Sequence, residues 1–374
     1  MDFGFSEEQE LLRAEVRKFL DQNAPLATVR EVAATDTGCD RSLWSQMAEL
    51  GWVGLLVPES FGGSGLDLIT SIVLLEETGR SLFPSPLIAT LLAARAIERA
   101  GSDEQKARWL PGLASGETVG TLAYLEANDR HDLEGIALEG KRDGATTRLS
   151  GEKQLVFDTA SADLFVVAYR SGAEPEAVSL AVVEANTAGL TVDHFPTMDA
   201  TKRLGRLRFE GVGVEPGARL GEEGTAGALT RELLDLGALL VTAEAVGAAE
   251  GAVALTTAYA QDRVQFGSPI GRYQGVKHPL AEAHVDIESI KSLVYYAGWA
   301  LEEAAEDAPV AVSRAKAYAS DALPRIGLEG VQLHGGVGYT AEYDIQLYLK
   351  RSRWVRTAFG DADHHFARLG AASL

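Results

Sequence analysis

The chain has 374 residues, of which 46% are hydrophobic and 7% aromatic, a composition that predicts a folded protein of two or three domains. Acidic residues outnumber basic residues by 54 to 34, and the formal charge of -20 repels nucleic acid and anionic membranes, so neither is expected as a partner. The only cysteine is Cys39, which excludes an internal disulfide and a cysteine-based metal cluster, and no metal site is predicted.

The first 117 residues predict an all-helical domain. Ser6 and Gln9 have the spacing of a capping box, and the residues from Leu11 to Leu20 then place apolar side chains at helical intervals. Further helical patterns cover residues 43–50, 66–78, 89–99 and 104–113. The start of the chain is too acidic for a signal peptide, and we find no run of about 18 apolar residues, so a cytoplasmic protein is expected.

Residues 118–222 have a different texture and predict a compact β domain. Short apolar runs rich in β-branched residues are separated by Gly, Asp, Asn and Pro, which is typical of strands and turns. The expected strands include residues 164–169, 178–183, 190–195 and 204–209.

Helical periodicity returns in residues 223–374 and predicts a four-helix bundle. The run 233–260 is alanine-rich and apolar on all sides, which favours a central helix. The next helix has an apolar stripe, with Asp286 among the charged residues expected to turn away from it, and residues 310–333 form a further helix.

Two motifs in this last region favour a site for an anionic cofactor. Val331-Gln-Leu-His-Gly-Gly-Val-Gly-Tyr339 breaks a helix with glycines, which let backbone N–H groups approach a pyrophosphate. The stretch from Arg263 to Gln274, Arg-Val-Gln-Phe-Gly-Ser-Pro-Ile-Gly-Arg-Tyr-Gln, offers a guanidinium, an aromatic ring and an amide. The predicted cofactor-binding residues are Arg263, Phe266, Gln274, Gln332, Gly335 and Gly336, with Arg272 and Lys277 adding positive charge.

The pattern Arg-x-x-Phe-Gly-x-x-Ile-x-x-x-Gln, followed by Gln-x-x-Gly-Gly-x-Gly-Tyr, resembles the acyl-CoA dehydrogenase family of flavoproteins, over essentially the whole chain. The resemblance implies a mainly α fold with a β-barrel between two helical domains. It also implies FAD-dependent α,β-dehydrogenation of an acyl-CoA to a 2,3-enoyl-CoA, as in β-oxidation. An electron-transfer flavoprotein or similar acceptor, and a homo- or hetero-oligomer with a homologous subunit, would be the partners.

The catalytic base of the family is missing from both of its usual places. Many members carry a Glu before a glycine near the C-terminus, where this chain has Phe359, and others use a Glu-Arg pair where this chain has Gly237 and Ala238. Glu244, inside an apolar helix, is the remaining candidate, although a structural Glu paired with an Arg occupies the same kind of environment. Asp361 and Asp363 are weaker candidates, and His364 and His365 are expected to be exposed near the C-terminus.

The residues that contact the flavin ring in the family are altered as well. The usual Thr-Glu-Pro-Gly-Ala-Gly-Ser-Asp appears as the segment from Tyr124 to His131, and the usual Lys-x-Trp-Ile-Thr-Asn as Lys153 to Asp158. The side chains of Leu155 and Phe157 can pack on a flavin ring but cannot hydrogen-bond to it.

The retained motifs are those that, in the family, reach across a dimer and hold the adenosine and pyrophosphate of a neighbour's FAD. The sequence therefore predicts a β-like subunit that completes the cofactor site of a catalytic homologue. The alternatives are a homomeric dehydrogenase that uses Glu244 and a flavin-free binding or scaffold protein on the same fold.

Overall fold

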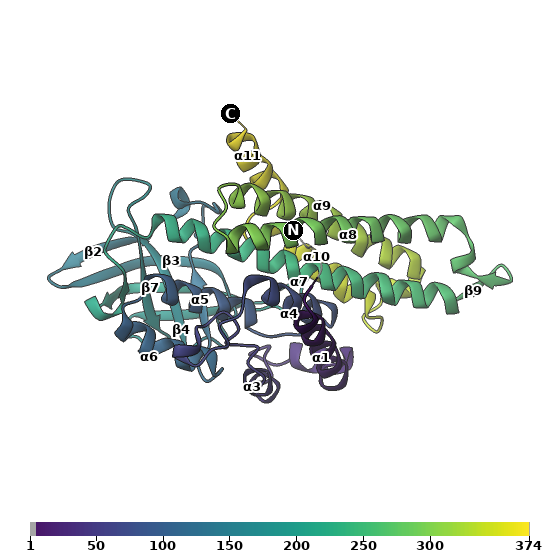
Figure 1. Cartoon of the computed structure of the whole chain (residues 1–374), viewed down its shortest axis with the longest axis horizontal. Helices are drawn as coiled ribbons and strands as arrows, with labels where there is room; N and C mark the ends of the chain where they lie inside the picture. The colour runs from purple at the N-terminus through teal and green to yellow at the C-terminus, as the bar shows by residue number, and fades with distance from the viewer. Residues whose placement is uncertain (1–4, 374) are drawn as a thin grey trace. The chain divides into compact units, whose positions relative to one another are not determined.

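The computed structural model describes residues 5–373, which form two compact units (Figure 1). The helical unit lies within residues 1–30, 68–83 and 238–374, and the mixed unit comprises residues 31–67 and 84–237. Each unit is built from segments distant in sequence, and the long helix α7, Gly227–Asp262, contributes residues to both.

The helical unit contains the C-terminal bundle and two N-terminal helices. Its further elements are α1 (Glu7–Asn23), α4 (Leu68–Arg80), β9 (Val264–Gln265), β10 (Ser268–Pro269), α8 (Gln274–Glu302), α9 (Ala308–His334), α10 (Ile345–Thr357) and α11 (Ala362–Ala372). Helix α2, Leu26–Ala33, begins in this unit and ends in the mixed unit. The predicted capping box at Ser6 is present, because Ser6 and Gln9 each accept a hydrogen bond from the backbone N–H of the other.

Close backbone contact between α4 and α7 explains two helical glycines. A Cβ at Gly247 would lie 1.7 Å from the Glu76 carbonyl oxygen, and one at Gly79 would lie 1.8 Å from that of Glu244. Because real side chains do not approach this closely, both positions require glycine for the helices to cross.

The apolar stripe of α8 is buried as predicted at Ile287, Ile290, Val294 and Ala297, while α9 packs against α8, α10 and α11. The prediction that Asp286 turns away is wrong. It is buried, and its carboxylate accepts hydrogen bonds from Tyr318 and Arg325 of α9, which offset the cost of burying the charge.

The mixed unit combines short helices with a sheet. Its elements are α3 (Arg41–Glu49), α5 (Leu87–Ala100), α6 (Asp103–Ala114), β1 (Gly120–Ala123), β2 (Glu139–Asp143), β3 (Thr146–Phe157), β4 (Leu164–Arg170), β5 (Val178–Glu184), β6 (Leu190–Phe195), β7 (Leu204–Val214) and β8 (Arg219–Leu220). The strand order is β6-β7-β3-β2-β4-β5-β8, and β1 pairs in parallel with β4.

Side chains from one face of this sheet make the core of the mixed unit, including Leu149, Phe165, Tyr169 and Phe209, all 2% exposed or less. Phe165, Val167 and Tyr169 occupy alternate positions of β4, which puts their side chains on one face of the sheet. The predicted fold class, with helical N- and C-terminal regions around a middle β region, is confirmed. The domain boundaries at 117/118 and 222/223 remain a prediction.

Helix α7 has no unbroken run of about 18 apolar residues, but it contains an 18-residue window whose mean hydropathy is high enough to cross a membrane by length and composition alone. However, 78% of that window is buried inside the protein, as expected for the central helix of a bundle.

Candidate functional site

The predicted cofactor-binding residues all belong to the helical unit and lie at the ends of its long helices. Arg263 directly follows α7, and the β9–β10 hairpin then leads to Gln274, the first residue of α8 (Figure 1). Phe266 is at the hairpin tip with φ of 53° and is 93% exposed. The Tyr273 hydroxyl donates to the carbonyls of Gln265 and Phe266, at 3.3 and 3.4 Å, so the hairpin is braced although its aromatic tip is in solvent.

The glycine loop follows α9 directly. Gly335 has φ of 65°, a left-handed conformation that favours glycine, and residues Gly335–Tyr339 form a short 3-10 helix. Gly335 and Gly336 are exposed, and a Cβ on either would meet no protein atom within 4 Å. Packing within the chain therefore does not require glycine at 336, whereas close approach of a ligand to the backbone would.

Tyr259 links the two motifs. Its hydroxyl donates to the backbone carbonyl of His334, at 3.2 Å, and the two rings stack with their centroids 4.3 Å apart. Arg263 lies one helical turn beyond Tyr259, since its N–H donates to the Tyr259 carbonyl. The last turn of α7 and the glycine loop are thus neighbours at one end of the bundle.

Positive charge collects at this end. Arg263, Arg272 and Lys277 are exposed, and Arg272 donates to the Ser268 hydroxyl at 3.3 Å. Within residues 5–373, the Arg263 guanidinium makes no side-chain hydrogen bond or ion pair. A guanidinium in that condition is available to an anionic group such as a pyrophosphate.

Phe359, where the resemblance predicts the family's catalytic Glu, lies in a tightly held turn between α10 and α11. It is 5% exposed and has φ of 55°, which costs energy for a bulky residue. Buried Lys316 of α9 bonds to the carbonyls of Arg356 and Gly360, at 3.2 and 2.7 Å, and to the Ser320 hydroxyl at 2.9 Å. The surrounding structure therefore fixes the strained backbone while the side chain at 359 carries no ionisable group.

The expectation that His365 is exposed is wrong. His365 is fully buried: its Nε2 lies 3.0 Å from the Phe359 carbonyl oxygen and its Nδ1 lies 3.3 Å from the Ser313 hydroxyl. Because a carbonyl only accepts, the proton sits on Nε2. Burial, reinforced by the neighbouring Lys316, lowers the pKa of His365 to about 2, so the ring is neutral and structural at physiological pH.

The two aspartates past Phe359 have different settings. Asp361 caps α11, because its carboxylate accepts from the His364 N–H at 3.0 Å, whereas Asp363 is exposed in the first turn of that helix. Capping accounts for Asp361 without a catalytic role.

Glu244 lies in the apolar interior of the helical unit and forms an ion pair with Arg351 of α10. The pair joins Oε2 to Nη1 at 3.3 Å, and the side chains are 4% and 0% exposed. This is the structural arrangement that competes with a catalytic role for Glu244.

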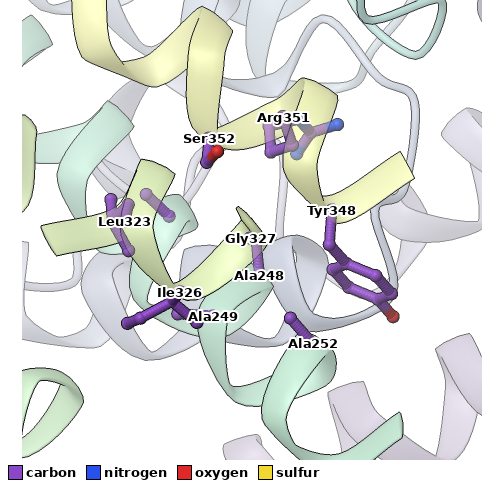
Figure 2. A pocket seen from close by; sticks show the side chains of 10 residues that line it. Ala248, Ala249, Ala252, Leu323, Ile326, Gly327, Tyr348, Arg351 and Ser352 are labelled. Atoms are coloured by element: carbon purple, nitrogen blue, oxygen red, sulfur yellow. The ribbon is translucent and has the colours of Figure 1, made fainter. Parts of the chain in front are cut away.

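The cavity beside this pair is too small for a substrate. Figure 2 shows Tyr348, Arg351 and Ser352 of α10 above a floor of α7 alanines, with Leu323, Ile326 and Gly327 of α9 alongside. Its volume of about 10 Å³ corresponds to one water molecule. Acyl chains do not fit there.

The two segments that the resemblance predicts beside the flavin ring lie in the mixed unit and are hydrogen-bonded to each other. The Tyr124 hydroxyl lies 2.8 Å from His131 Nδ1, and buried Lys153 donates to the Tyr124 carbonyl, at 3.1 Å, and to the Glu126 carboxylate, at 2.5 Å. Burial lowers the pKa of Lys153 to about 8, although Glu126 acts in the opposite direction. These polar groups therefore hydrogen-bond to one another within the mixed unit.

Leu155 marks a special backbone position that sequence reasoning missed. It has φ of 49°, is 43% exposed, and sits where the pairing of β3 with β7 shifts register. Such a bulge turns a side chain out of the regular sheet face. Leucine rarely adopts a left-handed backbone, so the sequence contained no indication of this conformation at residue 155.

The comparisons with known proteins agree with this architecture. Sequence models of the acyl-CoA dehydrogenase N-terminal and C-terminal domains match residues 6–117 and 223–374. The chain is 33% identical to the acyl-CoA dehydrogenase IpdE2 of Mycolicibacterium smegmatis, with 98% of this chain and 99% of that relative covered. The chain therefore belongs to the acyl-CoA dehydrogenase family, whose members bind FAD.

Two solved structures with this fold are named as pairs of components. A variant of the Tcur3481-Tcur3483 steroid ACAD matches with a TM-score of 0.89 and 31% identity, covering 98% of this chain and 97% of that chain. The ChsE4-ChsE5 complex from Mycobacterium tuberculosis matches with a TM-score of 0.91 and 26% identity, covering 100% and 99%.

Proposed function

We propose that this chain is the β-like subunit of a heteromeric acyl-CoA dehydrogenase and that it completes the FAD site of a catalytic homologue. The observation that carries the proposal is the turn at Phe359, which keeps a rigid, strained backbone at the family's base position but presents no carboxylate. Proton abstraction next to a thioester needs a positioned base. A partner subunit that retains the glutamate supplies it.

The retained half of the site supports the same assignment. Arg263 supplies an exposed positive charge, Gly335 and Gly336 expose backbone, and Tyr259 joins the two segments. A pyrophosphate requires charge and bare N–H groups in one place. These residues fit the adenosine and pyrophosphate half of FAD.

In the proposed reaction, FAD supplies the hydride acceptor for α,β-dehydrogenation of the acyl-CoA. Arg263, Gln332 and the glycine loop of this chain bind the cofactor and orient it. An electron-transfer flavoprotein or a similar acceptor would take the electrons from the bound cofactor. The proposed location of the enzyme is the cytoplasm. The structural relatives named as the Tcur3481-Tcur3483 steroid ACAD and the ChsE4-ChsE5 complex support a heteromer.

The test is co-expression with a homologue that carries the catalytic glutamate. Flavin absorbance and subunit stoichiometry should show a heterotetramer with one FAD per pair of subunits, whereas this chain alone should bind FAD weakly. Arg263→Ala should strip FAD from the complex, because a charge-assisted phosphate contact contributes about 1.5–3 kcal/mol, or roughly tenfold to hundredfold in affinity.

Arg314→Ala is the matched control, since Arg314 is an exposed arginine on α9 outside the predicted site. Tight FAD binding by the chain alone, with dehydrogenation unaided, would replace the proposal with a homomeric enzyme. A colourless chain that remains colourless in every complex would instead support a flavin-free scaffold.

A further inference from the structure

Three aromatic rings surround the start of the glycine loop. The Tyr259 ring stacks on His334 at an interplanar angle of 23°, and Tyr343 contacts both rings edge-on, with centroids 6.3 Å from His334 and 6.4 Å from Tyr259. The three residues come from α7, from the last residue of α9 and from the segment before α10. They are brought together only by the folded bundle.

The ring and the backbone carbonyl of His334 are both hydrogen-bonded within the bundle. Its Nδ1 lies 2.7 Å from the Gly330 carbonyl oxygen, which makes Nδ1 the protonated nitrogen, and the residue is 4% exposed. Its own carbonyl, one of those left without an intrahelical partner at a helix C-terminus, accepts the Tyr259 hydroxyl. The ring and the carbonyl of His334 are therefore both fixed by the same tyrosine.

Tyr259 contacts the chain on both sides of the loop, at His334 before Gly335 and at Tyr343 after it. The intervening loop contains glycines with wide conformational freedom and exposed side chains such as Tyr339, which is 82% exposed. Without an anchor at each end, such a loop would sample many backbone arrangements, and ordering it on ligand binding would cost affinity.

We propose that Tyr259 is a positioning residue of the cofactor cradle, the site formed by Arg263 and the Gly335–Gly336 backbone. Tyr259 holds that backbone in place for the pyrophosphate of a nucleotide such as the ADP half of FAD. This inference rests on the proposed function. Tyr259 lies in the last turn of α7 and Arg263 directly follows that turn, with its N–H hydrogen-bonded to the Tyr259 carbonyl. The residue that fixes the loop is therefore attached through one helical turn to the residue that supplies the charge. The loop and the guanidinium are thereby set relative to each other before the ligand arrives.

The test uses the co-expressed complex and two variants of Tyr259. Tyr259→Phe removes the bond to the His334 carbonyl and keeps the stacked ring, so FAD should dissociate about threefold to tenfold faster, as expected for loss of one neutral hydrogen bond. Tyr259→Leu removes the stack as well, and dissociation should accelerate by more than about tenfold. Inhibition of FAD rebinding by ADP should weaken by the same factors, because ADP occupies only the cradle.

Tyr348→Phe is the matched control, because its hydroxyl makes the same kind of bond, 3.0 Å to the backbone carbonyl of Arg80. A merely structural role for Tyr259 would lower the melting temperature as Tyr348→Phe does and leave ADP inhibition unchanged, which would overturn the inference. If Arg263→Ala strips FAD while both Tyr259 variants keep it, the inference fails and the proposed function stands. If Arg263→Ala also keeps FAD, the proposed function itself fails.

Discussion

Gly336→Ala separates a ligand-binding role of the glycine loop from a role in folding. A Cβ at this position would meet no protein atom within 4 Å, and Gly336 does not have the left-handed backbone of Gly335. Replacing such a glycine restricts the unfolded chain and stabilises the fold by about 0.4–1 kcal/mol. The variant should therefore fold at least as well as the unmodified chain.

Binding of FAD should respond in the opposite direction. An added methyl group at the surface approached by a pyrophosphate would displace it from the backbone N–H groups, and losing one charge-assisted hydrogen bond costs about 1.5–3 kcal/mol. We expect FAD affinity in the complex with a catalytic homologue to fall about tenfold to hundredfold. Affinity is measured by flavin fluorescence on titration, and stability by denaturant unfolding.

Gly370→Ala provides the control, because Gly370 of α11 is also exposed and a Cβ there would likewise meet no protein atom within 4 Å. It should gain similar stability with no change in FAD affinity. Unchanged FAD affinity in Gly336→Ala would refute the claim that a ligand approaches this backbone. Gly335→Ala is less informative, since its φ of 65° would strain alanine whatever binds there.

Two further predictions concern buried charges. Glu244→Gln should reduce dehydrogenation by the folded complex less than tenfold, whereas loss of a true base costs about a hundredfold or more. Breaking the pair with Arg351 should destabilise the fold by about 3–5 kcal/mol, so kinetics and denaturant unfolding separate the two effects. A thousandfold loss of activity with FAD bound would make Glu244 the base. Burial lowers the pKa of Lys316 from its ordinary 10.5 to about 7, so above pH 7 the unfolded chain holds a proton that the folded chain has released, and stability should rise between pH 7 and about 10. Lys316→Met should abolish that rise in unfolding measurements across this range, and an unchanged rise would exclude Lys316 as its source.

The sequence predicted most of the fold because its patterns are local. Short apolar runs rich in β-branched residues indicated β4 to β7, and helical spacing indicated α4 to α9, which the structure confirms. Asp286 was misplaced because its partners, Tyr318 and Arg325, lie on another helix. Periodicity on one helix carries no information about a polar partner that makes burial of a charge tolerable.

The candidate site was predictable only in part, for the same reason. The glycines and Arg263 predict a pyrophosphate site by their chemistry. The residue that joins them, Tyr259, lies in no recognisable motif, so the sequence did not single it out. The burial of His365 depends on how α11 packs on α9, and the strain at Leu155 depends on a bulge in a sheet pairing. Contacts between distant segments decide all three.

The measurement that tests the central claim most directly is the flavin content and subunit stoichiometry of this chain purified alone and with a homologue bearing the catalytic glutamate. The proposed role predicts little FAD on the chain alone, one FAD per pair of subunits in the complex, and loss of that FAD on Arg263→Ala but not on Arg314→Ala. One tightly bound FAD per chain in a homo-oligomer that dehydrogenates acyl-CoA unaided would contradict it.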